Sequence, residues 1–501
     1  MKLYKYLNHL DSLILAITGF YAIHLFTAYS GVGISPDSIM YASTATNIQN
    51  HLSLITFNNT PLVFFPVFFP VFLGIIQFFS GINPIQAGAY INQFLFAAVI
   101  FLSGFVITKF IPTYRIYKII ILIVIILSPG LLEVYSYLWS ETLFIFEILL
   151  FVILFGNYLK SSSKKNFVLI CLITAIACIT RYAGVTLIGA GCLILLINNQ
   201  STLKAKLLNS FIFGLASISL LIVNLILNRL STGLSTGTRE PSITPFSKNL
   251  YYIGTVLCDW GSLGKESYPF AIYLTCFIIL FLVSYLGYKL HKKQLNNYEA
   301  VAIIFSLVYI LFILITATFS RFERVNSRIL SPIIIPLILS CTCWVPEIIS
   351  KSKSDYKYAF ATISTVLILI FSYSTYQVDW QRYDDESDYG VPGYSDDDWN
   401  KSDFVTYLKK HKSIFKPNIP VYTDANEAVY LFTGMHSELL PHKFFKNDVK
   451  KFFAKQHFYL IWFDNLSNTE ILNLDEIKKV KNLILIGKAK EGEIYYCDSK
   501  K

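Results

Sequence analysis

Asp37 is the first residue of the sequence whose surroundings suit chemistry. It follows Ser35 and Pro36, and a serine can cap a short helix whose first turn accepts proline. Tyr41 lies one helical turn further on, so Asp37 and Tyr41 can face the same cavity. The Asp37 carboxylate could act as a base on a substrate hydroxyl. Alternatively, it only stabilises the positive end of the helix electrostatically.

Two glutamates belong to a later apolar run. Glu141 stands near the start of that run, from where its carboxylate could meet Asp37 across an external cleft, and Glu147 lies deeper. An acidic side chain within hydrocarbon is costly and usually faces the helix bundle or a water-filled cavity. We therefore expect Glu141 to share a site with Asp37, and Glu147 to hydrogen-bond a neighbouring helix.

The elements that must position these residues are membrane spans. Of 501 residues, 54% are apolar and only 15% are charged, and the chain contains 41 Phe and 33 Tyr. Crossing a bilayer takes roughly 20 apolar residues in a helix. The first apolar run is too long for a signal-peptide core and no small-residue cleavage site follows it, so it is a retained span. Eleven spans are predicted: Ser12–Tyr29, Ile85–Thr108, Ile116–Leu132, Leu138–Leu159, Asn166–Thr180, Tyr182–Ile197, Leu207–Leu227, Pro269–Tyr288, Ala300–Phe319, Ile329–Val345 and Tyr358–Tyr376.

Basic residues orient the spans, because lysine and arginine collect in cytoplasmic loops. They gather in alternate short loops, around Lys109, Lys160, Lys204, Lys289 and Lys351, and Lys2 and Lys5 place the N-terminus in the cytoplasm as well. The span at Ile85 must then run inward from outside, so the apolar segment Pro61–Phe79 does not cross. Its repeated prolines favour an interfacial or re-entrant helix. Residues 30–84 form one external loop.

The composition changes after the last span. The membrane domain is predicted to cover residues 1–377, and residues 378–501 to form a small α/β domain outside the cytoplasm. Its strands are expected at Pro420–Thr423, Phe458–Phe463, Leu483–Ile486 and Ile494–Cys497. The fold class is thus mainly α, a polytopic helix bundle of the plasma (inner) membrane with an extracytoplasmic domain.

Four arginines lie in loops that this topology places outside. Arg321, Arg324 and Arg328 crowd one loop, and Arg181 ends another outward turn. Because the positive-inside rule disfavours cations there, we expect an anionic partner, and the planar guanidinium suits phosphate oxygens. A lipid phosphate is the natural candidate. Alternatively, Arg321 or Arg324 pairs with Glu323 or with acidic residues of the tail.

Other kinds of site have little support. The eight cysteines lie mostly inside apolar runs, and no zinc-protease, phosphate-loop or serine-hydrolase motif occurs. The formal charge of +10 is spread along the chain, so no nucleic-acid partner is expected. The acidic stretch from Asp384 to Asp398 lacks the spacing of a calcium loop and is interpreted as a solvated linker. No metal ligands are assigned.

Several short motifs, in this order and mostly on the predicted external side, resemble one known family. They are Asp37 with Tyr41, Ala42 and Ala45; Pro61-Leu62 leading to Gly81; Ser128-Pro129 with Ser140-Glu141; Thr180 to Gly184; Arg328 to Pro332; and Val421 to Glu427 before Tyr430 to Gly434. The chain resembles the multi-spanning glycosyltransferases of the C superfamily (GT-C), which include protein mannosyltransferases and the lipid A aminoarabinose transferase. Ser38 stands where many relatives have a second acidic residue, so the need for a divalent cation is left open.

The resemblance implies a glycosyltransferase that moves a hexose or pentose from a polyprenyl-phosphate donor to an acceptor outside the cytoplasm, with inversion at the anomeric carbon. Asp37 would be the base, and Glu141, the second expected catalytic residue, would orient the sugar or acceptor together with Tyr41. Arg181 and Arg328 would stabilise the departing phosphate. Tyr182 and Arg324 complete the expected substrate-binding set. Membrane lipid and a protein, lipid or glycan acceptor are the expected partners.

Two other functions remain open at this point. A lipid or polysaccharide transporter or flippase would also have many spans and external arginines, but inverted repeats and broken helices at midplane are not evident. A sensor would use the tail to bind a ligand, although eleven spans are many for an anchor. Deleting the tail would separate a sensor from an enzyme, because only the enzyme could still bind a donor lipid.

Overall fold

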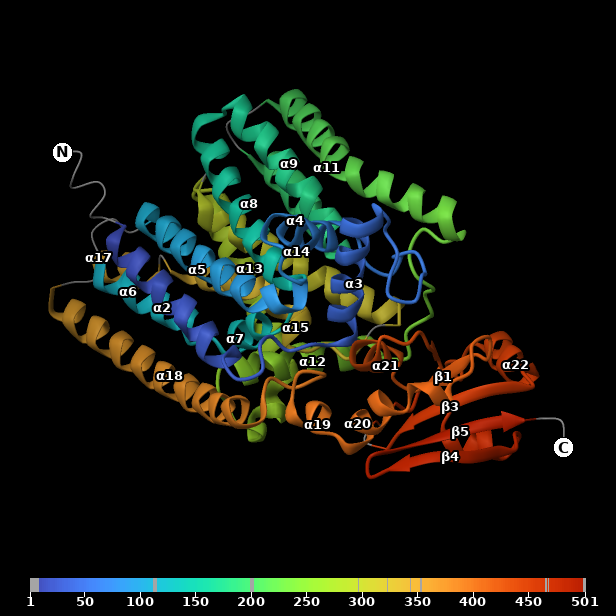
Figure 1. The fold of residues 1–501 in the computed structure, drawn as a ribbon. Coiled ribbons are helices and arrows are strands. Elements are labelled where there is room, and N and C mark those ends of the chain that lie inside the picture. Colours follow the sequence, from blue (N-terminus) through green and yellow to red (C-terminus); the bar gives the residue numbers. More distant parts are fainter. Residues whose placement is uncertain are drawn as a thin grey trace.

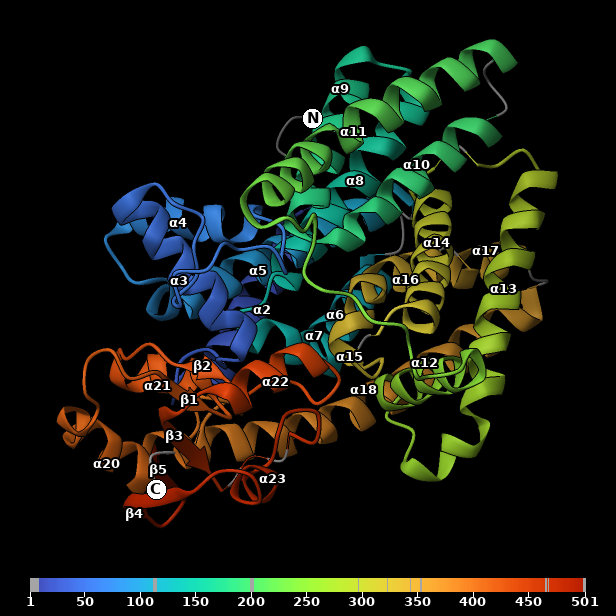
Figure 2. The ribbon, with the colours of Figure 1, turned by 90° about the vertical axis from the view of Figure 1, so that its right-hand side faces the viewer.

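The computed structural model describes residues 9–110, 115–198, 202–295, 297–321, 323–342, 344–351, 354–464, 466 and 468–498. Lys2 and Lys5, which support the predicted orientation of the N-terminus, lie outside these residues. A bundle of helices makes up most of the molecule, and a small sheet near the C-terminus lies against one end of it (Figures 1 and 2).

The described residues up to Tyr389 are mainly helical. Its helices are α2 (Leu10–Thr27), α3 (Pro36–His51), α4 (Phe68–Ser80), α5 (Pro84–Phe110), α6 (Arg115–Ile126), α7 (Pro129–Ser136), α8 (Glu141–Ser161), α9 (Lys164–Thr180), η1 (Tyr182–Gly184), α10 (Val185–Ile197), α11 (Leu203–Thr232), α12 (Phe246–Trp260), η2 (Lys265–Phe270), α13 (Ala271–His291), α14 (Tyr298–Phe319), α15 (Ser327–Leu330), η3 (Ser331–Ile333), α16 (Ile334–Cys341), α17 (Trp344–Lys351) and α18 (Ser354–Tyr389).

Most of the predicted spans are long helices. Among the described residues, α2, α5, α8, α11, η2 with α13, α14 and α18 are long and apolar enough to cross a membrane, and α6 with α7 would make an eighth. The predicted spans Asn166–Thr180, Tyr182–Ile197 and Ile329–Val345 correspond to the shorter helices α9, α10 and α15 to α16. The chain is a multi-pass membrane protein, and the number of eleven spans stays a prediction.

The predicted span Ile116–Leu132 is broken rather than straight. A bend of 51° separates α6 from α7. Pro129 opens α7, and a proline cannot donate a backbone hydrogen bond and disfavours helical geometry in the residue before it. The bend therefore follows directly from the sequence pair Ser128-Pro129.

The proline-containing segment Pro61–Phe79 becomes helical only in part. Helix α4 begins at Phe68 and ends where Gly81 takes a left-handed conformation with φ 69°. Its 13 residues span about 20 Å, which is shorter than the roughly 30 Å hydrocarbon core. Gly74 lets it pack on α3, since a Cβ there would lie 3.3 Å from the Ala45 carbonyl oxygen. The length supports the predicted interfacial helix.

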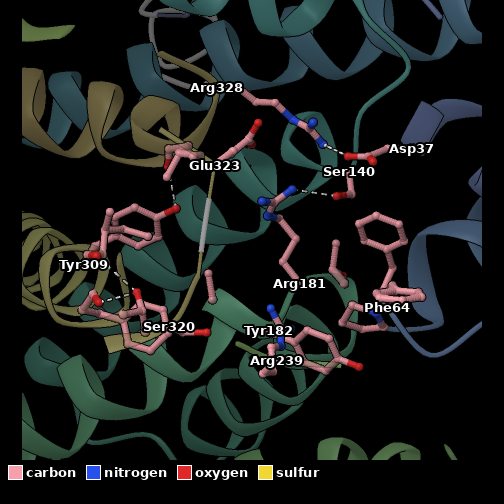
Figure 3. A pocket seen from close by; sticks show the side chains of 18 of the residues that line it. Asp37, Phe64, Ser140, Arg181, Tyr182, Arg239, Tyr309, Ser320, Glu323 and Arg328 are labelled. Atoms are coloured by element: carbon pink, nitrogen blue, oxygen red, sulfur yellow. Dashed lines mark hydrogen bonds and ion pairs between the residues drawn. The ribbon is translucent and has the colours of Figure 1, made fainter. Parts of the chain in front are cut away.

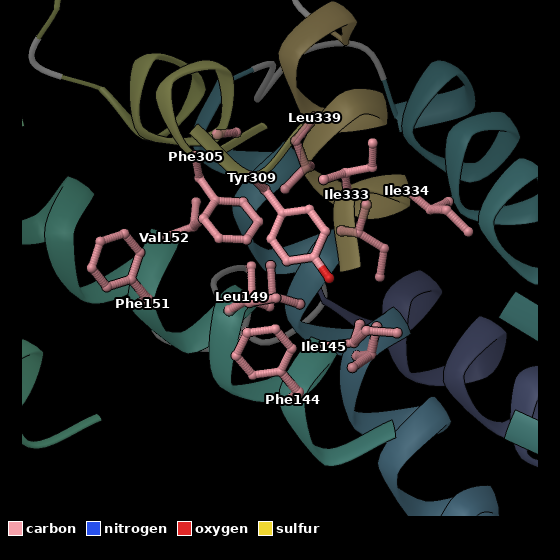
Figure 4. Close-up of a cluster of buried hydrophobic side chains, with 14 of the residues drawn as sticks. Phe144, Ile145, Leu149, Phe151, Val152, Phe305, Tyr309, Ile333, Ile334 and Leu339 are labelled. Atoms are coloured by element: carbon pink, nitrogen blue, oxygen red, sulfur yellow. The ribbon is translucent and has the colours of Figure 1, made fainter. Parts of the chain in front are cut away.

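A cluster of buried side chains fixes α8, α14 and α16 against one another. Figure 4 shows Phe144 and Leu149 of α8 close to Phe305 and Tyr309 of α14, and all four are 2% exposed or less. Within lipid, such close packing holds helices together, because the surrounding acyl chains are as apolar as the side chains. The Tyr309 hydroxyl donates to the Ile329 carbonyl at 2.8 Å and so fixes the short helix α15 to α14.

The described part of the tail contains a five-stranded sheet in the order β2-β1-β3-β5-β4. The strands are β1 (Val421–Thr423), β2 (Glu438–Leu439), β3 (His457–Phe463), β4 (Leu483–Ala489) and β5 (Gly492–Asp498). β1 pairs in parallel with β2 and β3, whereas β5 is antiparallel to β3 and β4. The predicted strands are present, and only the short β2 was not foreseen. The helices of this part are α19 (Asp397–Asn400), α20 (Asp403–Lys410), η4 (Lys412–Ile414), α21 (Asn426–Thr433), α22 (Lys446–Ala454) and α23 (Leu474–Lys478).

The acidic stretch from Asp384 to Asp398 is not a linker, contrary to the prediction. Its first residues are the last turns of α18, so the residue where the tail was expected to begin, Val378, lies inside a helix. Asp396 then caps α19 by accepting from the Trp399 amide at 3.2 Å, and Asp397 pairs with Lys401 at 2.6 Å. The carboxylates are used locally as helix caps and ion-pair partners.

The tail shares a hydrophobic core with α3 and with the segments just before and after it. Ile34, Ile39 and Phe57 pack with Phe404 and Val429 of the tail. Backbone hydrogen bonds reinforce this packing: the Tyr394 amide donates to the Ile34 carbonyl at 2.9 Å. The position of α3, and therefore of Asp37, depends on the tail.

Gly393 offers a direct test of this dependence. Its φ is +106°, and a Cβ at this position would lie 2.6 Å from the Ile34 carbonyl oxygen. We expect Gly393→Ala to destabilise the protein by on the order of 1–3 kcal/mol and to increase amide hydrogen exchange in α3. Gly434→Ala is the control, because Gly434 is also left-handed but has no atom within 4 Å of the added Cβ. Equal exchange of α3 in the two variants would contradict the proposed coupling.

Candidate functional site

A cavity of about 390 Å³ opens where α3, the start of α8, the turn after α9 and α15 meet (Figure 3). Its polar lining residues are Asp37, Tyr41, Ser140, Thr180, Arg181, Tyr182, Arg239, Tyr309, Thr316, Ser320, Glu323 and Arg328. This lining set contributes three guanidinium groups and two carboxylates, and the buried Glu141 beside it supplies a third carboxylate. The guanidinium groups that line the cavity can donate hydrogen bonds to an anionic ligand.

Asp37 is held at the N-terminus of α3 as the sequence predicts. Ser35 caps the helix, and its side chain and that of Ser38 exchange hydrogen bonds with each other's backbone amides. The Trp139 indole N–H donates to Ser35 Oγ at 2.9 Å, which fixes the cap to the segment before α8. The Asp37 carboxylate therefore has a defined position at the rim of the cavity.

A backbone bridge brings Asp37 and Glu141 to the same place. The Gly33 amide donates to the Ser136 carbonyl at 2.8 Å, and the Leu138 amide donates to the Gly33 carbonyl at 3.1 Å. A Cβ on Gly33 would lie only 2.5 Å from the Tyr137 ring, so no larger residue fits this crossing. The loop before α3 is in this way paired with the entry to α8.

Four charged side chains form an alternating row. Arg328 contacts Asp37 through Nη2 at 2.5 Å and Glu141 through Nε at 2.6 Å, and Arg181 Nη1 contacts the other Glu141 oxygen at 2.6 Å. The Glu141 side chain is 1% exposed, whereas that of Asp37 is 25% exposed. A buried carboxylate needs such partners to stay ionised at acceptable cost. The two charges of Glu141 and Asp37 are balanced by two arginines.

Aromatic residues set the orientation of Arg328. Its guanidinium carbon lies 4.3 Å from the centre of the Trp139 ring, and Trp139 stacks on Tyr137 with ring centres 4.1 Å apart. A guanidinium over an indole gains a cation–π attraction in addition to its ion pairs. The same tryptophan therefore fixes both Arg328 and the Ser35 cap beside Asp37.

Tyr41 is buried beside this row. Its hydroxyl lies 3.3 Å from Ser140 Oγ, which also accepts from Arg181 Nη1 at 2.9 Å. Burial raises the pKa of the Tyr41 phenol above its ordinary value, and the carboxylates of Asp37 and Glu141 raise it further. Tyr41 is therefore a neutral hydroxyl that can orient a ligand but does not ionise.

Two other predicted residues lie in different places. Tyr182 lines the cavity and donates to the Val63 carbonyl at 3.1 Å. The described residues that line the cavity do not include Arg324. Its guanidinium carbon lies instead 4.5 Å from the centre of the Tyr252 ring on α12. The two arginines diverge because α15 begins only at Ser327, so Arg324 precedes the helix that directs Arg328 inward.

Two further charged residues, Arg321 and Glu147, make structural contacts of the kind considered from the sequence. Arg321 pairs with the tail residue Glu470 at 2.8 Å and with Glu240 at 3.1 Å. Glu147 accepts a hydrogen bond from Thr180 Oγ1 at 2.8 Å, so it joins α8 to α9, as expected.

Among the lining residues that the sequence did not assign to the site, three carry ionisable groups. Arg239 lies in the connection between α11 and α12, and its charge in a loop that the predicted topology places outside was a usable signal. Glu323 was considered only as an ion-pair partner, yet it lines the cavity; enclosure by the protein raises the pKa of its carboxyl, although Arg328 opposes this. Tyr309 gave no signal, because it resembles any aromatic residue within a span.

No metal-binding cluster is found in the part of the chain that the structure describes. No three His, Cys, Asp or Glu side chains of these residues converge as ligands.

Known proteins were compared with the chain in three ways. No protein-family model matches it, and no curated protein matches it in sequence. Its fold does match solved structures: the chain shares the fold of ArnT, a multi-spanning GT-C glycosyltransferase. The resemblance predicted from the motifs is thereby confirmed at the level of the fold.

Two of the matching structures are of one protein, ArnT from Cupriavidus metallidurans. ArnT bound to undecaprenyl phosphate has a TM-score of 0.59 and 9% identity, over 98% of this chain and 98% of that one. The apo state of ArnT has a TM-score of 0.59 and 10% identity, over 99% of this chain and 98% of that one. The arabinofuranosyltransferase AftD from mycobacteria has a TM-score of 0.46 and 15% identity, over 97% of this chain and 41% of that one.

The buried position of Glu141 makes a prediction about stability. Glu141→Gln leaves Arg181 and Arg328 without their shared counter-charge, and removing one partner of a buried ion pair costs about 3 kcal/mol or more. Asp37→Asn, at the exposed end of the row, is expected to cost about 1 kcal/mol or less. Thermal unfolding in detergent micelles measures both, and equal melting temperatures of the two variants would refute this ordering.

Proposed function

We propose that the protein is an integral membrane glycosyltransferase that moves a sugar from a polyprenyl-phosphate donor to an acceptor outside the cytoplasm. The observation that carries this proposal is the row Asp37, Arg328, Glu141 and Arg181 beside a cavity lined by three arginines. The fold shared with ArnT, a protein solved with undecaprenyl phosphate, supports the same donor class.

The arginines are proposed to bind the donor phosphate. Arg181 and Arg328 both line the cavity, and their side chains are 20% and 14% exposed, so they are accessible yet shielded from bulk water. A guanidinium donates to phosphate oxygens in a fixed planar geometry, and it gains strength where the charge of a leaving phosphate develops. Glu141 orients both guanidinium groups for this contact.

Asp37 is proposed to be the catalytic base. The acceptor oxygen forms a bond to the anomeric carbon, the bond from that carbon to the lipid phosphate breaks, and its electron pair stays on the phosphate. The hydroxyl proton passes to the Asp37 carboxylate, which is exposed enough for the hydroxyl to reach it. Tyr41 and Tyr182 are proposed to position the sugar.

The cavity is proposed to face away from the cytoplasm. It lies at the end of the bundle where the tail packs, and the basic loops around Lys160 and Lys289 belong to the opposite ends of their helices. On this orientation the N-terminus is cytoplasmic and the tail extracytoplasmic. The donor would enter from the outer leaflet of the plasma (inner) membrane.

Asp37→Asn tests the base. The amide cannot accept the proton, so transfer should fall by at least about 100-fold while the protein stays folded and inserted. The measurement is release of polyprenyl phosphate from the donor that co-purifies with the wild-type protein, identified by mass spectrometry. Asp259→Asn is the control, since Asp259 is exposed on α12, where its side chain accepts from the Tyr268 hydroxyl at 2.8 Å. Near-normal turnover by Asp37→Asn would exclude this role.

Lysine substitutions test the phosphate site. Arg328→Lys and Arg181→Lys keep the charge but lose the planar fork, so about 10-fold less polyprenyl-phosphate lipid should co-purify. Arg324→Lys should retain the lipid, because Arg324 contacts Tyr252 instead of the cavity. Quantitative lipid mass spectrometry compares the three variants. If all three retain equal amounts of lipid, the arginine cavity is not the phosphate site.

A further inference from the structure

A second cavity, of about 500 Å³, lies between the tail and the helix bundle. Four segments distant in sequence line it: the loop before α4 with Phe64, the α11–α12 connection with Glu240, the α14–α15 connection with Arg321, and the tail with Phe444 and Glu470. It shares the lining residues Phe64 and Glu323 with the first cavity. The two cavities therefore adjoin, and a ligand in the second can extend toward the first.

Arg321 joins three of these segments. Its Nη1 contacts Glu240 at 3.1 Å, its Nη2 contacts Glu470 at 2.8 Å, and its guanidinium carbon lies 3.9 Å from the centre of the Phe444 ring. The backbone amide of Arg321 also donates to the Glu240 carbonyl at 2.6 Å. Arg321 is thus a structural partner of the tail, and the cavity has a defined shape around it.

The charge of the second cavity differs from that of the first. Its lining carries the carboxylates of Glu240, Glu323 and Glu470 against the single guanidinium of Arg321 and the imidazole of His442, whose Nδ1 lies 3.8 Å from Glu470. A phosphate-rich ligand would be repelled here, whereas carboxylates accept hydrogen bonds from hydroxyl groups. The donor phosphate and the ligand of the second cavity must therefore differ in chemistry.

Exposed aromatic rings complete the lining. Phe444 and Phe64 are each 51% exposed, although large apolar side chains are usually covered. An exposed ring beside hydrogen-bonding groups offers an apolar face together with fixed polar contacts, which is the lining of a site for an amphiphilic ring-shaped ligand. A sugar has such a shape, with hydroxyl groups at its edge and C–H bonds on its faces.

We propose that the second cavity binds a phosphate-free, hydroxyl-rich carbohydrate segment of the acceptor, so that the reaction extends or decorates a glycan. This inference rests on the proposed function, since it assigns the acceptor of that reaction. The acceptor sugar would lie on Phe444 with its hydroxyls on Glu240 and Glu470. Its reacting hydroxyl would pass Glu323 to reach Asp37 in the first cavity.

Photo-crosslinking in the native host tests the proposal on the full-length protein. A benzophenone amino acid replaces Phe444, and in a matched protein it replaces Leu485, which is 49% exposed on the edge strand β4. After irradiation, mass spectrometry of the purified protein should find a phosphate-free glycan attached at position 444 and not at position 485. Capture of a peptide, capture of a phosphorylated glycan or lipid, or no capture at 444 would each overturn the proposal.

The same samples separate this inference from the proposed function. If polyprenyl-phosphate sugar co-purifies but no glycan is captured, only the acceptor assignment fails; if no donor lipid co-purifies, the proposed function fails first. With the captured glycan as acceptor, Phe444→Ala should raise its KM about 10-fold and leave kcat within about two-fold, because one aromatic contact is lost. Leu485→Ala should change neither constant. An unchanged KM in Phe444→Ala would contradict the stacking contact.

Discussion

The ionised Glu141 carboxylate, held between two guanidinium groups, is the interaction on which the site depends. A carboxylate with 1% of its side chain exposed is tolerable only when both of its oxygens are paired with cations. Arg181 and Arg328 supply these charges from two different parts of the chain, and Arg328 extends the row to Asp37. One buried charge therefore fixes the relative positions of α3, α8, the turn after α9 and α15.

The helices around this row are arranged so that it can persist. Tyr309 hydrogen-bonds the Ile329 carbonyl and fixes α15, and Trp139 supports both Arg328 and the cap of α3. In lipid, the surrounding solvent does not favour apolar contact between helices, so such close packing and polar contacts must determine how they associate. The tail contributes from the other side, because Ile34 and Ile39 of the first loop belong to its core.

The two adjoining cavities differ in the charged groups of their linings. Arginines dominate the inner lining and carboxylates the outer one, with Glu323 in both. The inner cavity suits an anion, and the outer one suits a neutral partner that can donate hydrogen bonds. The tail holds α3 and also provides Phe444 and Glu470 to the lining of the outer cavity, which on the proposed function would give it a part in acceptor binding.

Features that depend only on neighbouring residues could be predicted from the sequence. Long apolar runs indicated the membrane helices, Ser128-Pro129 the break between α6 and α7, and Ser35-Pro36 the start of α3, because hydropathy, proline geometry and helix capping act over a few residues.

Which charged side chains meet depends on how the chain folds in three dimensions. Arg324 and Arg328 look equivalent in sequence, but one contacts Tyr252 and the other enters the cavity; Arg321 pairs with Glu470, which lies 149 residues further along the chain. The pairing of such residues depends on the crossing of distant segments, such as Gly33 over Tyr137, and no local pattern records it.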